Sequence, residues 1–172
     1  MGRAYTKNND PFFYERYPLF TNCGSFALRV KEWYCPISLV DREFMEPERE
    51  DMAWDMHNDG VDFEEIRDIF LEWDVKAILK DFENEIRIVE SREAELEPDE
   101  ELIAFRECVE DMGDWISADF HFRVYRDGLW QEKMGSGDVM VCEGDIEDDE
   151  WAYSADLIYS GPIVYFAHKI GF

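Results

Sequence analysis

The clearest structural signal in this chain lies at residues 120–134, which read FHFRVYRDGLWQEKM. Two runs rich in aromatic and β-branched residues flank Asp127 and Gly128, a dipeptide typical of the two-residue type I′ turn of a β-hairpin. With these two residues in the turn, Tyr125 pairs with Trp130. The stretch therefore predicts an antiparallel hairpin with a defined register.

Further strand patterns surround this hairpin. Apolar runs bounded by turn residues predict strands at 86–89, 102–109 and 163–167, and a short strand or sheet edge at 139–142. The run at 163–167, IVYFA, is almost wholly apolar, which is typical of a strand in the interior of a sheet. We therefore expect about five strands, mostly antiparallel, with the last one lying centrally.

The N-terminal half shows helical spacing instead. Apolar residues recur at helical intervals after Cys23, and either Thr21 or Asn22 can cap a helix that Pro36 would end. A second helical pattern runs over 63–73, with a further short one at 75–82. The polar stretch at 46–60 predicts a solvated loop, and residues 1–20 an aromatic, loop-like arm.

The order of these patterns indicates the fold class. Residues 21–84 are mainly helical and residues 85–172 mainly strands, without a linker rich in Gly or Ser between them. Helices followed by strands favour an α+β fold, with the N-terminal helices packed on one face of the sheet. We expect residues 1–172 to form a single domain.

The charge balance limits the possible partners. The chain carries 42 Asp and Glu against 17 Lys and Arg, which gives a formal charge of -25, yet 16% of its residues are aromatic. Such an aromatic content argues against simple disorder, and such a charge argues against direct nucleic-acid binding. The charge is compatible with a basic protein partner.

The termini and cysteines point to an intracellular protein. The N-terminus lacks the apolar stretch of a signal peptide, and no apolar run reaches the ~20 residues of a membrane helix. The four cysteines form no C-x-x-C pair, so we expect reduced thiols, a cytoplasmic location and neither a metal site nor a cofactor.

Cys23 is the candidate nucleophile. It stands at the start of a predicted helix, where the helix dipole and free amides favour a thiolate and should lower the thiol pKa. A cysteine nucleophile also needs a histidine base within hydrogen-bond reach. His121 opens a sheet strand, whereas His57 lies in a polar acidic stretch and His168 near the end of the last strand. The Cys23 amide and the Asn22 side chain are the expected oxyanion donors.

The hairpin register supplies a candidate for the third catalytic residue. Glu132 and His121 lie on the same face as diagonal neighbours, within reach of long side chains. Glu132 can therefore orient the imidazole, as the third member of a catalytic triad does. Asp119 and Asp138 are the alternative orienting carboxylates.

Two blocks of the chain resemble papain-like cysteine hydrolases. Residues 22–28, NCGSFAL, resemble the Asn-Cys-x-x-aromatic-Ala-Leu start of these domains. Residues 119–135, DFHFRVYRDGLWQEKMG, resemble a block that follows the cysteine motif in small proteins of bacteria and their phages. The resemblance implies a Cys-His hydrolase of the broad NlpC/P60 and papain group, with Cys23 as nucleophile and His121 as base. Glu132 departs from the block, which often has His before its Lys.

Two functions from different classes are compatible with these observations. The first is cleavage of an amide or ester in a peptide-like or other small carbonyl substrate, or descent from such an enzyme with loss of its activity. The second is an acidic phage-type inhibitor, a DNA mimic that blocks a basic nucleic-acid-binding enzyme of the host defence. The acidic runs at 41–65, 90–101 and 143–150 would then imitate DNA phosphates.

Overall fold

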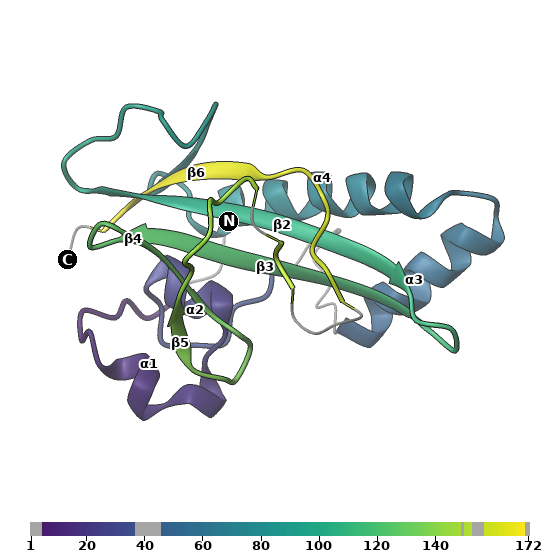
Figure 1. Ribbon diagram of the computed structural model, residues 1–172, viewed down its shortest axis with the longest axis horizontal. Coiled ribbons are helices and arrows are strands. Elements are labelled where there is room, and N and C mark those ends of the chain that lie inside the picture. The colour runs from purple at the N-terminus through teal and green to yellow at the C-terminus, as the bar shows by residue number, and fades with distance from the viewer. Residues whose placement is uncertain (1–4, 37–45, 149, 153–156, 171–172) are drawn as a thin grey trace.

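The computed structural model describes residues 5–36, 46–148, 150–152 and 157–170. Within these residues, six antiparallel strands form one open sheet in the order β1-β6-β2-β3-β4-β5 (Figure 1). The strands are β1 (Ile86–Val89), β2 (Glu100–Asp111), β3 (Ile116–Arg126), β4 (Leu129–Lys133), β5 (Val139–Val141) and β6 (Val164–Lys169). The helices are α1 (Phe13–Arg16), α2 (Cys23–Leu28), α3 (Glu46–Asn58) and α4 (Phe63–Asp81), with a 3₁₀ turn at Pro18–Phe20. The expected α+β class is confirmed, with six strands rather than about five.

The central hairpin has the predicted register. Tyr125 pairs with Trp130 across the turn, and Asp127 and Gly128 adopt φ values of 55° and 78°, as a type I′ turn requires. The C-terminal strand β6 lies between β1 and β2, so its predicted interior position is also confirmed. Both features follow from local sequence, because turn chemistry and apolar content act over a few residues.

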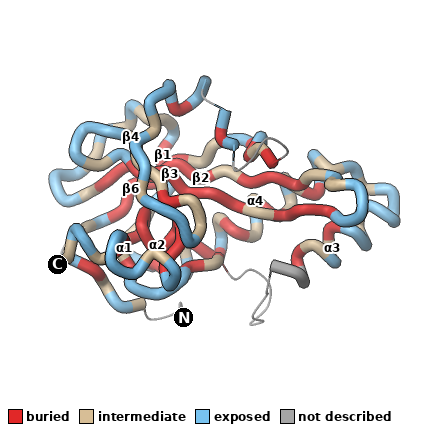
Figure 2. The backbone as a smooth tube through the Cα atoms, turned by 60° about the horizontal axis from the view of Figure 1, so that its bottom comes forward, coloured by how far each residue is buried: buried red, intermediate tan, exposed pale blue. Residues whose placement is uncertain are grey.

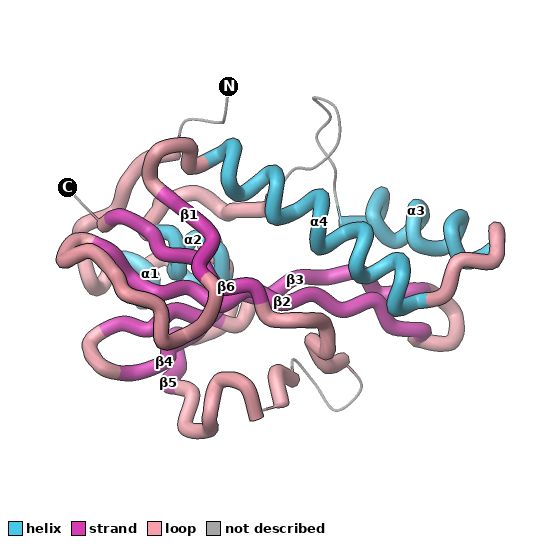
Figure 3. Tube along the Cα trace, turned by 90° about the horizontal axis from the view of Figure 1, so that it is seen from above, coloured by secondary structure: helices cyan, strands magenta, loops and turns pink. Residues whose placement is uncertain are grey.

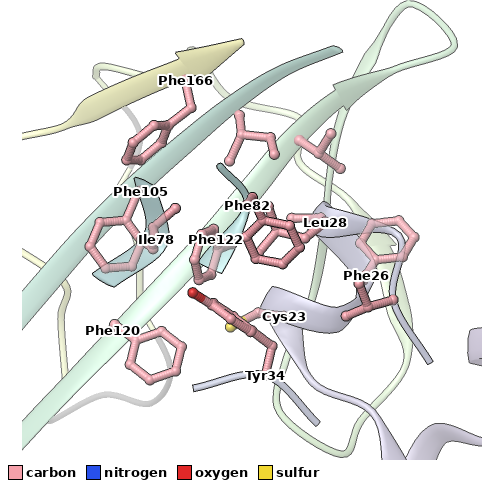
Figure 4. Packing of buried hydrophobic residues seen from close by; sticks show 14 of the residues in the cluster. Cys23, Phe26, Leu28, Tyr34, Ile78, Phe82, Phe105, Phe120, Phe122 and Phe166 are labelled. Carbon is pink, nitrogen blue, oxygen red and sulfur yellow. The ribbon is translucent and has the colours of Figure 1, made fainter. Parts of the chain in front are cut away.

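The two faces of the sheet are covered differently. Figure 3 shows α4 on one side of the sheet and the long loop after β5 on the other. On the helix side, Phe105, Phe122 and Phe166 pack against α2 and α4 (Figure 4). On the loop side, Trp151 and Tyr159 pack against alternate residues of β2 and β6. Buried residues consequently run along β2 and β3 (Figure 2).

Helix α2 is much shorter than its sequence pattern predicts. It ends at Leu28, because Arg29 adopts a left-handed conformation (φ 55°) and stops the helix well before Pro36. Its start matches the expectation, since Asn22 is the N-cap and shares a capping box with Ser25. The predicted position of Cys23 in the first turn is therefore correct.

The prediction of a solvated loop at 46–60 is wrong, because α3 (Glu46–Asn58) forms most of this stretch. The helix has a narrow buried side, formed by Ala53 and by Arg49, which makes a buried ion pair with Asp74 of α4. Arg49 also lies 3.9 Å from the Glu107 carboxylate of β2. A polar helix stabilised by the ion pairs of one arginine and a few contacts shows little apolar periodicity in its sequence. In the part of the chain that the structure describes, no helix is both long and apolar enough to cross a membrane.

Candidate active site around Cys23 and His121

Cys23 and His121 line the same pocket. Its volume is about 200 Å³, and it opens beside the start of α2 and the middle of β3. Its walls also include the aromatic side chains of Trp33 and Tyr159 and the carboxylate-bearing residue Asp119. Residues distant in the sequence thus converge on a small polar and aromatic pocket of the kind that binds small ligands.

The pocket exists because β3 lacks a long partner along one edge. Among the described pairs, β4 pairs with β3 only along Val124–Arg126 of β3. From Gln131 to Lys133, β4 pairs with β5 on its other side. Cys23 belongs to the helix-side core with Phe120 and Phe122 (Figure 4). His121 points to the opposite face, because side chains alternate along a strand. The two side chains reach the pocket from opposite faces of β3.

The imidazole of His121 is held on several sides. Its Nε2 atom lies 2.8 Å from Oε2 of Glu132, and the Tyr159 ring stacks on it with centroids 5.1 Å apart. Glu132 also accepts a 2.7 Å hydrogen bond from Nε of Arg123. The predicted contact between His121 and Glu132 is therefore present, although its catalytic role stays a prediction.

The negative charge of Glu132 determines which nitrogen of the His121 ring carries the proton. Burial alone would raise the pKa of Glu132, but the hydrogen bonds from His121 and Arg123 lower it to about 2. An ionised carboxylate only accepts, so Nε2 of His121 must carry the proton. In a neutral ring the lone pair is then on Nδ1, which has no hydrogen-bond partner among the described residues. Nδ1 is consequently the basic atom of His121.

The alternative carboxylates do not contact the histidine. Oδ2 of Asp119 accepts a 2.8 Å hydrogen bond from the Tyr159 hydroxyl, and Oδ1 accepts one from the Phe120 N–H. Asp138 is exposed beyond the end of β4. Among these three carboxylates, Glu132 is the one hydrogen-bonded to His121. Sequence reasoning missed Tyr159, which lies in an irregular segment without a recognisable motif.

Cys23 differs from its sequence-based expectation. Its side chain is only 5% exposed, and burial raises the thiol pKa far above its ordinary value. The N–H groups of Phe122 and Gly24 act in the opposite direction, and the negative charge of Asp119 raises the pKa further. The predicted fall in pKa is therefore wrong, because desolvation outweighs the amides at the start of a six-residue helix. Cys23 is a neutral thiol at rest.

Asn22 performs a structural task that competes with the expected oxyanion role. Its Oδ1 accepts hydrogen bonds from the Ser25 and Tyr34 N–H groups, and its Nδ2 donates a 2.6 Å hydrogen bond to the Tyr34 carbonyl. The amide therefore fixes the loop after α2 as well as the helix start. To stabilise an oxyanion through the same hydrogen, the side chain would have to leave Tyr34.

Lys133 connects the two blocks of sequence that form the site. Its side chain is buried, and Nζ donates to the carbonyls of Pro18, Thr21 and Gly135 at 2.8, 2.7 and 2.6 Å. An ammonium group has three hydrogens, so all of its donors are used. Lys133 thereby fixes the segment before Cys23 to the end of the hairpin.

No match to this chain was found among protein families, characterised proteins or solved structures. Among the described residues, no group of three or more His, Cys, Asp or Glu side chains is arranged to hold a metal ion. All four cysteines are free thiols.

Proposed function

We propose that this protein is a papain-like cysteine hydrolase that cleaves an amide or ester bond in a peptide-like substrate. The observation that carries the proposal is the pocket itself, which is lined by both Cys23 and His121. The hydrogen bond from His121 to Glu132 supports it, because that bond leaves Nδ1 as the basic atom. The two sequence blocks that resemble papain-like hydrolases contain the same three residues.

The mechanism begins from a neutral thiol. Because the two side chains reach the pocket from opposite faces of β3, one water in the pocket carries the proton of Cys23 to His121 as the sulfur attacks the substrate carbonyl, which gives a tetrahedral oxyanion. The backbone N–H of Cys23 is the expected donor to this oxyanion. His121 then returns the proton to the leaving amine or alcohol, and a thioester remains on Cys23. Water, deprotonated by His121, cleaves the thioester and regenerates the thiol.

The experiment that tests this proposal is the trapping of an acyl-enzyme. We expect p-nitrophenyl acetate, an ester small enough for the pocket, to acetylate Cys23 through a thioester that hydroxylamine removes. Intact-protein and peptide mass spectrometry locate the modification. His121→Ala should lower the rate of acetylation by about 10² or more, because the general base is removed.

Cys142→Ala is the matched control. Cys142 is a partly exposed thiol that does not line the pocket. The substitution should leave acetylation of Cys23 unchanged. Acetylation that persists in Cys23→Ala, or a wild-type Cys23 that is never acetylated, would contradict the hydrolase proposal. The second result would favour an inactive relative.

A second candidate function is the acidic inhibitor, and the distribution of exposed carboxylates favours it. Helices α3 and α4 form a hairpin at one end of the molecule (Figure 1). Its exposed acids are Asp51, Asp55, Asp59, Asp62, Glu64, Glu65, Asp68 and Glu72. Although Lys76 is paired with Glu72, carboxylates are in large excess on this surface, and such an excess attracts basic proteins at long range.

Competition with DNA tests the inhibitor. If this surface mimics DNA, the protein should displace duplex DNA from a basic nucleic-acid-binding enzyme at physiological salt. Neutralising Asp55, Asp59, Glu64 and Asp68 to Asn or Gln should weaken the displacement by about tenfold or more. Displacement that vanishes at physiological salt, or that the fourfold variant retains fully, indicates only non-specific attraction.

A further inference from the structure

The carboxylate of Asp119 is an uncompensated charge in the wall of the pocket. It is partly buried, and its two hydrogen-bond donors, the Tyr159 hydroxyl and the Phe120 N–H, are both neutral. Within the described parts of the chain, no Lys or Arg side chain forms an ion pair with it. Glu132 differs in this respect, since it is paired with Arg123.

The field of this charge reaches neighbouring elements. Beyond the effect of burial, Asp119 raises the pKa of Cys23 on α2, of Glu50 on α3 and of Tyr159 in the segment before β6. These three groups lie on three different elements around the carboxylate. Asp119 therefore contributes negative charge to the pocket, and the nearby cation Lys133 is committed to the carbonyls of Pro18, Thr21 and Gly135.

The remaining walls suit a cation as well. Trp33, whose side chain is 43% exposed, and Phe120 provide aromatic surface in the same pocket. Aromatic faces and carboxylates both attract guanidinium and ammonium groups, and the attraction grows where water is excluded. The net charge of -25 further concentrates cations near the surface.

We propose that this pocket binds a cationic group of the substrate, a guanidinium or an alkylammonium, between the Asp119 carboxylate and the aromatic wall. This inference rests on the proposed function, because it places the cation beside the bond that Cys23 would attack. Asp119 then selects the substrate rather than orienting His121.

The bound cation would also help to activate the nucleophile. The charge of Asp119 opposes formation of the thiolate at Cys23, and a cation on Asp119 removes that opposition. The thiol then ionises more easily when the correct substrate is present. Such coupling protects a buried thiol from unselective reaction, since its nucleophilicity increases only on binding.

Binding of a charged and a neutral amide of the same shape tests the subsite. The probes are Nα-acetyl-arginine amide and Nα-acetyl-citrulline amide, titrated by calorimetry into the Cys23→Ser variant at physiological salt. We expect the arginine amide to bind at least about tenfold more tightly. Asp119→Asn should remove this preference, and Asp119→Glu should retain most of it. Asp138→Asn, which neutralises an exposed carboxylate outside the pocket, should leave the preference intact.

A second measurement follows the thiol directly. In the wild-type protein the arginine amide should accelerate alkylation of Cys23 by iodoacetamide, whereas the citrulline amide should not. In Asp119→Asn the alkylation should be faster from the start and insensitive to either amide. Equal binding of the two amides, or a preference that survives in Asp119→Asn, would overturn the subsite.

The two proposals fail in different ways. If the arginine amide is selected but no ester acylates Cys23, the subsite stands and the hydrolase proposal is rejected. If esters acylate Cys23 without any preference for charge, the hydrolase stands and the subsite is rejected. Circular dichroism of each variant confirms that it is folded before it is compared.

Discussion

Replacing Lys133 with methionine is expected to lower the free energy of unfolding by about 4 kcal/mol. Methionine fills a similar volume but donates no hydrogen bond, so the carbonyls of Pro18, Thr21 and Gly135 lose their shared donor. A buried acceptor without a partner costs about 1–3 kcal/mol; the bond to Thr21 is buried and those to Pro18 and Gly135 are partly buried, so the three together are expected to cost about 4 kcal/mol. Urea denaturation followed by fluorescence measures the change.

The matched control is Lys76→Met on α4. Lys76 is exposed, and its one described ion pair joins it to Glu72, four residues earlier in the helix. Its replacement should cost no more than about 0.5 kcal/mol. If both substitutions have equally small effects, the three hydrogen bonds of Lys133 are not what stabilises the start of α2.

Lys133→Met should also lower the acetylation of Cys23, since the segment before Cys23 loses its hydrogen bonds to the end of the hairpin.

The sequence predicts those features that local chemistry determines. The register of the β3–β4 hairpin follows from Asp127 and Gly128, because this dipeptide favours the two-residue turn with positive φ values that joins the strands there. The contact of His121 with Glu132 follows in turn from that register. The capping of α2 by Asn22 is equally local, since the partner, Ser25, is three residues away.

Features that depend on tertiary contacts escaped prediction. Helix α3 is stabilised by the ion pair of Arg49 with Asp74, which lies on another helix, so its own sequence reads as a polar loop. The pKa of Cys23 is set by the side chains that bury it, whereas the sequence reveals only its position at a helix start. Tyr159 reaches His121 from an irregular segment, and no periodicity marks such a residue.

At this site the contact between His121 and Glu132 could be predicted from the sequence, whereas the surroundings of Cys23 and Asp119 could not. His121 and Glu132 are placed by one hairpin, but the neutral state of Cys23 and the unpaired charge of Asp119 arise from packing between distant segments. This division explains why the contact of His121 with Glu132 could be predicted from the sequence while the protonation state of the Cys23 thiol could not. It also makes Glu132 the residue whose role is most directly testable.

Replacing Glu132 with glutamine is expected to slow the acetylation of Cys23 by about 10²- to 10³-fold. Glutamine preserves the shape of the side chain, but its amide can donate as well as accept, so it no longer fixes the proton of His121 on Nε2. The charge that stabilises the protonated ring during the reaction is also lost.

Because the pKa of Glu132 is about 2, the carboxylate is ionised throughout the range from weakly acidic to basic pH. The rate should therefore fall across that whole range.

Glu147→Gln is the matched control for this prediction. Glu147 is likewise a carboxylate that accepts a side-chain hydrogen bond, in its case 3.0 Å from the Tyr165 hydroxyl, and it does not line the pocket. Its replacement should leave acetylation within about twofold of the wild type. Thermal unfolding separates a catalytic from a structural effect, since Glu132→Gln should lose rate even where the protein is fully folded. An unchanged acetylation rate in Glu132→Gln would mean that Tyr159 and the surrounding packing suffice to orient His121, and that the carboxylate contributes only to the ion pair with Arg123.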